Sequence, residues 1–297
     1  MNNESRRPCP ACQSTEAGYC GSKNNFEIFV CGHCASIFTS HLPASDETED
    51  YDAYYTDANL SVPDFISERL KEIVGQFAGY RQNNRLLDVG FGAGTILREA
   101  TNQKWDAFGT EVSKTACEHG KKLGYKVFHG TLSEGGFEDN YFDVVTASEI
   151  LEHLPDPEAE LREVARILRP GGLFWATTPS ARSLSFRLMK ESWTIVSPPE
   201  HTQLYSKAGA TLMLRNAGFT NVRMVTSGLN PAEIVNYYRS PKQESTGFNR
   251  VGKGYELNEQ LTKSPFRKRV KNSLNVALNL FQLGDSLKIF AQKDGGK

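Results

Sequence analysis

The sequence predicts an α/β protein with a mostly parallel sheet, helices on both faces of that sheet and a small metal-binding module at the N-terminus. Three observations support this prediction. From Arg85 onward strand-like segments alternate with helical ones, a glycine-rich turn follows the first of these strands, and two Cys-x-x-Cys pairs precede them all. Alternating strand and helix units form parallel sheets that helices cover on both sides. The 297 residues suffice for one large domain and one small module.

The expected strands are short apolar runs with helical segments between them. The strands lie at residues 85–89, 106–111, 126–128, 142–148, 172–178, 220–226 and 286–292. The helices lie near residues 63–79, 94–103, 113–123, 158–168 and 206–217. Gly218 follows the last of these helices and is typical of a helix C-terminus.

We expect three parts along the chain. Residues 1–42 form a zinc ribbon whose central strand is residues 26–30, and residues 43–84 form a linker with a covering helix. Residues 85–297 form the large domain. Residues 228–285 interrupt its strand–helix alternation, so we interpret them as an insertion before the final strand rather than as a third domain.

The cysteines indicate a structural zinc site. Two Cys-x-x-Cys turns are separated by 18 residues, and each turn directs two thiolates at one point, so that together they complete the tetrahedral ligand set of zinc. Disulfides are the alternative interpretation, and His33 is an alternative ligand within the second turn. Cys20 and Cys117 lack partners at ligand spacing and are expected to be packed or half-exposed thiols. The four predicted ligands are Cys9, Cys12, Cys31 and Cys34.

Composition and charge narrow the classes of partner. The chain is 39% hydrophobic and 23% charged, and its formal net charge of −1 gives no overall positive field toward nucleic acid or anionic lipid. No apolar run is long enough for a membrane span, and the polar N-terminus does not resemble a signal peptide. We therefore expect a cytoplasmic protein without a membrane span, for which nucleic acid is a disfavoured partner.

A glycine-rich turn after the first large-domain strand predicts a nucleotide-type cofactor. Gly90, Gly92 and Gly94 follow Asp88, and glycines let the backbone approach a ligand at the N-terminus of the next helix. Dinucleotide enzymes use a similar turn, so the turn alone is not specific. Glu111 ends the next strand 17 residues after Gly94, where a carboxylate accepts hydrogen bonds from both ribose hydroxyls.

Four stretches in order resemble the class I S-adenosylmethionine-dependent methyltransferases. These stretches are Leu86–Gly94, Gly109–Glu111, Phe142–Pro157 and Leu168–Thr178. The resemblance covers residues 85 to about 226 together with the final strand. It implies a seven-stranded, mostly parallel, Rossmann-like sheet with helices on both faces, in which residues 286–292 supply an antiparallel last strand.

The same resemblance implies residues that bind the cofactor S-adenosylmethionine. By this resemblance, the methionine end and ribose of the cofactor would be lined by Gly90, Gly92 and Gly94. Asp88 would hold the turn or bind the amino group, and Glu111 would bind the ribose hydroxyls. Thr131 and Leu132 would frame the adenine. Many relatives carry an aspartate near Thr131 that bonds the adenine amino group, and this chain lacks it.

Methyl transfer to a hydroxyl needs a proton acceptor near the activated methyl group, and histidine is the simplest one. His153 follows the fourth strand of the large domain and lies four residues after Glu149, so both share one face if this segment is helical. His201 and Glu200 form a second candidate pair. We predict that one histidine is the general base and that Glu149 or Glu200 fixes its tautomer. In the alternative interpretation Glu152 and His153 cap a helix or contact substrate only.

Two further possibilities concern neighbouring residues. Glu149, Glu152 and His153 resemble a divalent-metal triad of quinone-biosynthesis O-methyltransferases, which makes Mg²⁺ a possible additional cofactor. Three linker tyrosines are expected either to cover the cofactor or to pack in the core. They are Tyr51, Tyr54 and Tyr55.

The acceptor is expected to be a small molecule. The zinc ribbon, residues 152–157 and 199–201 and a terminal Gly-Asp-Ser strand together resemble bacterial methyltransferases of sugar, surface-glycan and natural-product pathways. O-methylation of a sugar or natural-product hydroxyl is therefore the predicted reaction, with C- or N-methylation of a nucleotide-linked sugar as an alternative. Two other classes stay open. One is an RNA base methyltransferase that uses basic residues between 239 and 271, and the other is a non-catalytic protein that binds S-adenosylmethionine as a partner of another enzyme.

Overall fold

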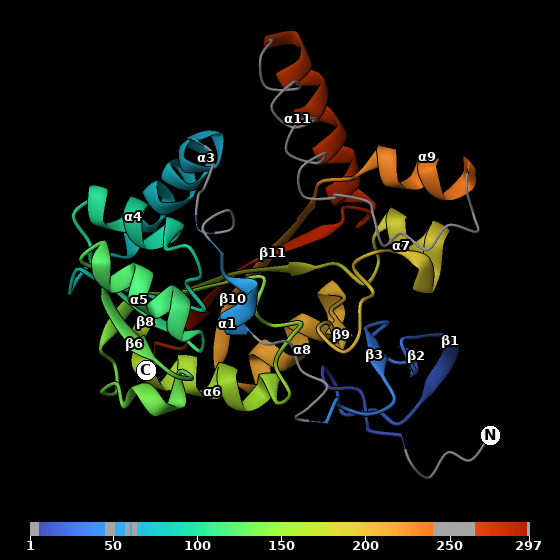
Figure 1. The fold of residues 1–297 in the computed structure, drawn as a ribbon, viewed down its shortest axis with the longest axis horizontal. Helices are drawn as coiled ribbons and strands as arrows, with labels where there is room; N and C mark the ends of the chain where they lie inside the picture. Colours follow the sequence, from blue (N-terminus) through green and yellow to red (C-terminus); the bar gives the residue numbers. More distant parts are fainter. Residues whose placement is uncertain (1–5, 45–50, 57–59, 61–63, 240–264, 296–297) are drawn as a thin grey trace. The chain divides into compact units, whose positions relative to one another are not determined.

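The computed structural model describes residues 6–44, 51–56, 60, 64–239 and 265–295 (Figure 1). Much of the predicted insertion, residues 240–264, lies outside the described residues together with several of the basic residues considered for RNA binding. The chain divides into two compact units, and each is described by itself. The ribbon unit comprises residues 1–42, 179–209 and 224–288, and the sheet unit comprises residues 43–178, 210–223 and 289–297.

A seven-stranded sheet has the order β10-β11-β8-β7-β4-β5-β6. Its strands are β4 (Arg85–Val89), β5 (Asp106–Glu111), β6 (Lys126–His129), β7 (Phe142–Ser148), β8 (Leu168–Pro179), β10 (Phe219–Ser227) and β11 (Ser286–Lys293). β4 pairs in parallel with β5 and β7, β5 pairs in parallel with β6, and β7 pairs in parallel with β8. The predicted α/β class and the seven strands of the mostly parallel sheet are confirmed.

The helices that precede and separate these strands are also present where the sequence predicts them. They are α3 (Asp64–Gly75) with the short η1 (Gln76–Tyr80), α4 (Thr95–Asn102), α5 (Lys114–Lys122), α6 (Pro157–Ile167) and α8 (Lys207–Asn216). Their starts follow from local chemistry. The hydroxyl of Ser113 accepts the Ala116 N–H at the start of α5, and Asp156 accepts the Ala159 N–H at the start of α6, where Pro157 needs no N–H partner.

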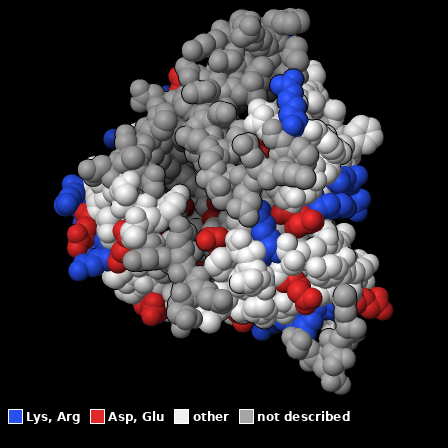
Figure 2. Space-filling model, turned by 45° about the vertical axis from the view of Figure 1, so that its right-hand side comes forward, with Lys and Arg blue, Asp and Glu red and all other residues white. Residues whose placement is uncertain are grey.

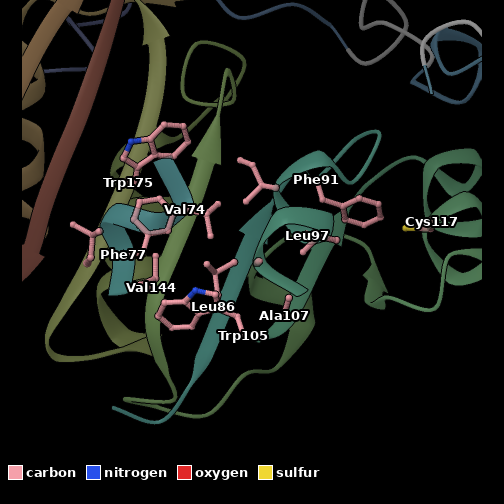
Figure 3. Packing of buried hydrophobic residues seen from close by; sticks show 13 residues of the cluster. Val74, Phe77, Leu86, Phe91, Leu97, Trp105, Ala107, Cys117, Val144 and Trp175 are labelled. Atoms are coloured by element: carbon pink, nitrogen blue, oxygen red, sulfur yellow. The ribbon is translucent and has the colours of Figure 1, made fainter. Parts of the chain in front are cut away.

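The core of the sheet unit lies along its central strands. Leu86 of β4 and Val144 of β7 are fully buried, as expected for parallel strands covered on both faces. The predicted covering helix contributes Phe77, whose ring centroid lies 6.0 Å from that of Trp175 on β8. Figure 3 shows this contact beside Val74. Residues 64–80 therefore seal one part of the core and do not act as a bare linker.

The ribbon unit contains a second, four-stranded sheet in the order β1-β2-β3-β9. Its strands are β1 (Ala17–Lys23), β2 (Phe26–Cys31), β3 (Ile37–Thr39) and β9 (Gln203–Leu204). β1 and β2 form a hairpin through Asn24 and Asn25, whose φ angles of 51° and 66° suit a two-residue turn between twisted strands. The remaining helical segments are α1 (Tyr51–Tyr54), η2 (Ser133–Gly135), α7 (Leu184–Met189), η3 (Lys190–Ser192), α9 (Pro231–Arg239) and α11 (Pro265–Leu280).

The N-terminal ribbon, which we expected to be a module of its own, shares a core with a distant part of the chain. Ile28 and Ile37 of the ribbon strands are buried against residues of 181–204, among them Trp193 and Leu204. The fourth strand of the ribbon sheet comes from this same part of the chain. The sequence pattern of residues 1–42 contains no sign of this partner, because the contacts are made by apolar side chains without a motif.

Among the described residues, no helix combines the length and the apolar character that crossing a membrane requires. The predicted cytoplasmic location stays a prediction.

Candidate functional site

The glycine turn after β4 has the backbone conformation that only glycine adopts freely. Gly90, Gly92 and Gly94 have φ angles of 63°, 52° and 70°. A Cβ on Gly90 would lie 2.2 Å from Cδ1 of Ile150, so the Ile150 side chain would have to shift to admit it. Gly94 precedes the first residue of α4, and the turn therefore delivers the chain directly to a helix N-terminus.

Glu111, at the end of β5, is tied to this turn. Its Oε2 accepts the N–H of Gly92 at 3.0 Å, and its Oε1 accepts the N–H of Ser113 at 3.0 Å. The side chain is buried at 5% exposure. Each carboxylate oxygen can accept a further hydrogen bond. Glu111 thus fixes the turn and keeps acceptor capacity for the two hydroxyls of a ribose.

Asp88, at the end of β4, is a buried carboxyl beside a second one. The hydroxyl of Thr146 donates to its Oδ1 at 2.7 Å. Burial, with a smaller contribution from the negative charge of Glu111, raises the pKa of Asp88 to about 7. A buried carboxyl in this state favours a cationic ligand, because a nearby ammonium group stabilises its charged form.

The segment after β6 contains a carboxylate that the sequence reading missed. Glu134 accepts the N–H of Thr131 at 2.8 Å and its hydroxyl at 2.9 Å, and these bonds hold the pKa of Glu134 below its usual value. Leu132 is buried at 1% exposure. Glu134 therefore fixes both the backbone and the side chain of Thr131. The Thr-x-x-Glu spacing of a capping box was the signal that could have indicated it.

The tyrosine-containing segment before α3 lies over the glycine turn. The hydroxyl of Tyr55 lies 2.9 Å from the position that a Cβ on Gly92 would take. Asp52 accepts the Ser113 hydroxyl at 2.9 Å and the Thr115 N–H at 3.2 Å, which attaches the segment to the first turn of α5. None of the three linker tyrosines is buried, which favours a covering position over a core position.

The turn after β7 carries three of the predicted catalytic and metal-binding residues. Glu149 has a φ of 55°, which is uncommon for a residue with a side chain, and its N–H donates to the Thr177 carbonyl at 2.8 Å. Glu152 is fully buried and accepts the Thr178 hydroxyl at 2.9 Å. Burial, and then the negative charge of Glu149, raises the pKa of Glu152 well above its usual value. His153 lies in the same turn, so the helical face expected for Glu149 and His153 does not form.

Glu200 and His201 belong to the ribbon unit. His201 Nδ1 lies 2.7 Å from the carbonyl oxygen of Ile195. The backbone N–H of His201 donates to the Ser197 carbonyl at 3.1 Å. A carbonyl only accepts, so Nδ1 carries a proton and Nε2 is the basic nitrogen of the neutral ring. Ile195 thus has the tautomer-fixing role that we expected of a glutamate.

The four predicted zinc ligands come together in the ribbon unit. The Sγ atoms of Cys9 and Cys34 are 3.6 Å apart, those of Cys12 and Cys31 are 3.5 Å apart, and all four lie within 4.8 Å of one another. A tetrahedral site with zinc–sulfur bonds of about 2.3 Å has sulfur–sulfur separations of about 3.8 Å. All four cysteines are free in this structure, so the donor set fits zinc and the disulfide alternative is not adopted.

The backbone around the cluster also suits thiolate ligands. The N–H of Cys34 points to the Sγ of Cys31 at 3.5 Å, and Gln13 and Ala35, which follow the two turns, both have a φ of 59°. The hydrogen bond with Cys9 lowers the pKa of Cys34 to about 4, while that bond together with burial raises the pKa of Cys9. Four thiols packed this closely share protons when no cation is bound, and a bound zinc ion would hold all four as thiolates.

Comparison with known proteins agrees with this geometry. The family model described as a methyltransferase domain matches residues 62–224, more than half of the chain. The chain belongs to this methyltransferase family. Its predicted identification as a class I, S-adenosylmethionine-dependent type of methyltransferase is thereby confirmed at the level of the domain.

Similar curated proteins include two ubiquinone biosynthesis O-methyltransferases. The one from Bordetella avium is 34% identical over 144 residues, which are 45% of this chain and 59% of that protein. The one from Methylococcus capsulatus is 34% identical over 112 residues, which are 35% of this chain and 47% of that protein. The chain therefore spans only about half the length of the curated relatives it matches.

Solved structures share the fold at low sequence identity. An S-adenosylmethionine-dependent methyltransferase from Archaeoglobus fulgidus superposes with a TM-score of 0.54 and 20% identity, covering 82% of this chain and all of that one. A chain from the complex of the Haloferax volcanii Trm112 methyltransferase activator with a putative methyltransferase gives a TM-score of 0.53 and 17% identity, covering 83% of this chain and 99% of that chain. At these identities the likeness shows the fold alone.

The methyltransferase domain thus gathers the predicted cofactor residues in the sheet unit. Asp88, the three glycines and Glu111 lie at adjacent ends of the paired strands β4 and β5, and Thr131 and Leu132 follow β6. The predicted catalytic residues are divided between the units, with Glu149 and His153 in one and Glu200 and His201 in the other. Three residues that hold this arrangement were absent from the sequence prediction. They are Asp52, Glu134 and Thr146.

Proposed function

We propose that the protein is an S-adenosylmethionine-dependent methyltransferase that transfers a methyl group to a hydroxyl of a small molecule. One observation carries this proposal, which is the glycine turn held in left-handed conformations by the buried carboxylate of Glu111. Asp88 lies at the same end of the sheet with a pKa of about 7, which suits the ammonium group of the cofactor's methionine portion.

In this proposal each residue has a defined task toward the cofactor. Asp88 accepts hydrogen bonds from the amino group, Glu111 accepts them from the ribose hydroxyls, and Leu132 packs beside the adenine. Thr131, oriented by Glu134, takes the place of the aspartate found in many relatives, because its hydroxyl oxygen keeps a lone pair while donating to Glu134. Tyr55 covers the turn at Gly92 and helps to exclude water.

When bound, S-adenosylmethionine supplies a methyl group activated by its positively charged sulfur. The protein has to align the acceptor oxygen with this methyl group and remove the hydroxyl proton. We propose His153 or His201 for the proton. His201 already has the suitable tautomer, with Nδ1 donating to Ile195 and Nε2 as the proton acceptor.

A second candidate for activating the acceptor is a divalent cation. The raised pKa of Glu152 and the negative charge of the adjacent Glu149 favour a cation beside these two carboxyls, and His153 would add a nitrogen ligand. Stimulation of turnover by Mg²⁺ after removal of all divalent ions, with zinc still bound at the cysteines, would support this candidate.

The four cysteines are proposed to bind one structural zinc ion, and their reduced state fits the predicted cytoplasmic location. For the acceptor we propose a sugar or natural-product hydroxyl, and the curated relatives, which are named ubiquinone biosynthesis O-methyltransferases, support oxygen as the acceptor atom. A small molecule is preferred over RNA, because Lys and Arg side chains are mixed with Asp and Glu side chains on the face shown in Figure 2 and the net charge is −1.

The experiment is a methyl-transfer assay with the zinc-loaded protein and isotopically labelled S-adenosylmethionine. The acceptors are nucleotide-linked sugars, free sugars, phenols with two adjacent hydroxyls and total RNA, and the product is analysed by mass spectrometry to locate the methyl group. Gly90→Ala should abolish transfer because its Cβ overlaps Ile150, whereas Gly79→Ala has no atom within 4 Å of its Cβ and should be fully active. Label found on nitrogen, carbon or RNA, or binding of the cofactor with no transfer to any acceptor, would overturn the proposal.

A further inference from the structure

The segment that carries His201 makes hydrogen bonds to the N-terminal ribbon along its length. We call residues 193–206 the His201 segment. The β1–β2 hairpin of the ribbon binds the beginning of this segment. Lys23 Nζ donates to the Trp193 carbonyl at 3.2 Å, and Asn24 Nδ2 donates to the Pro198 carbonyl at 2.7 Å. Both donors lie at the turn between β1 and β2, so the tip of this hairpin fixes the first half of the segment.

Strand β3 of the ribbon holds the residues that follow His201. The Thr39 N–H donates to the Thr202 carbonyl at 3.0 Å. Phe38 then pairs with Gln203 in the antiparallel ladder of β3 and β9. His201 is therefore the residue immediately before a strand of the ribbon sheet, and its backbone position depends on β3.

The second cysteine turn continues this attachment. The hydroxyl of Ser206 donates to the carbonyl of Cys34, and the Ser206 N–H donates to the hydroxyl of Ser36 at 3.2 Å. Ser206 is fully buried. Cys34 is a predicted zinc ligand, so a single buried serine connects the metal site with the end of the His201 segment.

Arg7, two residues before the first zinc ligand, makes the same connection from the other cysteine turn. Its guanidinium group donates to the Thr39 carbonyl at 3.0 Å, to the Thr202 carbonyl at 2.7 Å and to the Gln203 side chain at 3.1 Å. These bonds join β3 to β9 and to the residue before it. Both cysteine turns thus lead into the residues directly after His201.

Side chains of the ribbon and of the His201 segment line one small pocket together. Ile28 and Ile37 of the ribbon line one side of a pocket of about 10 Å³, and Val196 and His201 line the other. Such a volume holds about one water molecule. Close packing and the hydrogen bonds between β3 and β9 therefore favour movement of the two parts together.

The His201 segment has little structure of its own to hold it in place. It contains only the two-residue β9, and fixing each backbone residue costs about 1–2 kcal/mol of conformational free energy. A small ribbon cannot supply this order from its own apolar core, whereas a structural zinc ion contributes folding free energy directly. A bound zinc ion would therefore add to the order of the ribbon and, through it, to that of His201.

We propose that the zinc-loaded cysteine cluster positions His201 for the reaction, and that Ser206 and Arg7 are the positioning residues that transmit this effect. This inference rests on the proposed methyl transfer only for its kinetic consequence. Its structural content is that zinc binding and the order of residues 193–206 are one cooperative event within the ribbon unit. The cofactor residues of the sheet unit should not depend on it.

The first test measures how well ordered the His201 segment is in the wild-type protein. Hydrogen exchange is measured by mass spectrometry with zinc bound, after removal of zinc by a chelator, and after zinc is added back. Residues 193–206 should lose protection together with the ribbon and regain it with zinc, while β4 and β5 keep theirs. A Trp105→Phe, Trp175→Phe double variant leaves Trp193 as the single tryptophan, and its emission should shift to longer wavelength on zinc removal because Trp193 is fully buried.

The second test separates positioning from general stability. Ser206→Ala should lower kcat for methyl transfer about tenfold or more, with the dissociation constant for S-adenosylmethionine unchanged, because the Cys34 carbonyl and the Gly209 N–H both lose their partner. The matched control is Ser185→Ala. Ser185 is equally buried in the same unit, and its hydroxyl has no hydrogen-bond partner among the described residues.

The outcomes distinguish this inference from the proposed function. If the wild-type protein methylates no acceptor, the exchange and Trp193 measurements still decide whether zinc orders the segment. Zinc-free protein that keeps full protection at residues 193–206, or Ser206→Ala kinetics equal to those of Ser185→Ala, would overturn the inference while leaving the methyltransferase assignment intact.

Discussion

The glycine turn and the cysteine cluster are both built around a bound group, but they are assembled from the chain in opposite ways. At the turn, the key hydrogen bond joins Gly92 and Glu111, which are 19 residues apart. At the cluster, Arg7 bonds Gln203 across 196 residues, and Ser206 bonds Cys34 across 172. The first site lies within one β-α-β unit, whereas the second depends on the tertiary fold.

The two sites therefore differ in how far apart in the sequence their interacting residues lie. A parallel β-α-β unit brings the ends of neighbouring strands together, so residues at fixed spacings converge without help from distant segments. The cysteine turns are equally local as ligands. Their effect on the His201 segment is not local, because it depends on hydrogen bonds between residues that are far apart in the sequence. If the two sites are independent, a substitution at one of them should leave the other intact.

The largest effect is expected from loss of zinc. Cys31→Ser should reduce bound zinc from about one equivalent to near zero and unfold the ribbon, since structural zinc contributes on the order of 10 kcal/mol to folding of such modules. The sequence alone predicts that this loss stops at residue 42. The shared core of Ile28 and Ile37 with Trp193 predicts that residues 193–206 lose order as well.

Zinc content is measured by elemental mass spectrometry and local order by hydrogen exchange. The control is Cys20→Ser, because Cys20 is a half-buried cysteine outside the cluster and its loss should leave zinc content unchanged. Full zinc occupancy in Cys31→Ser would contradict the four-cysteine site.

The second prediction concerns which unit supplies the base. Replacement of the true base, either His153→Ala or His201→Ala, should lower kcat by about 10²–10⁴-fold with cofactor affinity unchanged. The other replacement should have a much smaller effect. The control is His119→Ala on α5, which we do not expect to take part in proton transfer. If both variants keep near-wild-type turnover, alignment of the reactants alone carries the reaction.

The contrast between the two sites also explains which structural features could be predicted from the sequence. All seven strands of the main sheet were predicted, because buried parallel strands are rich in apolar runs such as Leu173–Ala176. The candidate cofactor residues were predicted because closely spaced glycines after one strand, and a glutamate at the end of the next strand, are typical of a nucleotide-type cofactor site. Strand β9 was not predicted, since a two-residue strand has no periodicity and exists only because β3 lies beside it.

The residues that were missed share one physical property. Asp52, Glu134 and Arg7 are ordinary surface residue types whose roles come from hydrogen bonds to backbone or hydroxyl groups. Such bonds depend on the geometry of a turn or a strand pair and leave no pattern in composition. The tautomer of His201 is a similar case, because its partner is the main-chain carbonyl of Ile195 and any residue could supply it.

A smaller effect is expected at Glu111. Glu111→Ala should weaken S-adenosylmethionine binding by about 1.5–3 kcal/mol, or roughly 10- to 150-fold, because it removes the ribose contacts and leaves the N–H groups of Gly92 and Ser113 without their acceptor. Glu111→Gln should lose less, since an amide oxygen still accepts one of these bonds. Calorimetry measures the affinity, and Glu118→Gln on the exposed side of α5 is the control. Unchanged affinity in Glu111→Ala, or a preference for NAD, would reject the assignment.

The smallest expected effect is a pH dependence of cofactor affinity at Asp88. Its pKa is raised from 3.8 to about 7 by burial, so the folded protein without cofactor binds a proton at this site in the interval between these values. For folding, the contribution of this group therefore decreases as pH rises from about 4 to about 7 and then stays constant. Cofactor binding has the opposite sign, because the ammonium group favours the charged carboxylate and lowers its pKa in the complex.

Binding should accordingly release a proton in this range. Affinity is expected to fall about eightfold between about pH 7.5 and about pH 6, following the ionised fraction of a group with a pKa of about 7. Asp88→Asn should bind more weakly at pH 7.5 and show little of this slope, because an amide does not titrate. Calorimetry in two buffers of different ionisation enthalpy counts the released proton. A wild-type slope equal to that of Asp88→Asn would mean that Asp88 only holds the glycine turn through Thr146 and does not meet the amino group.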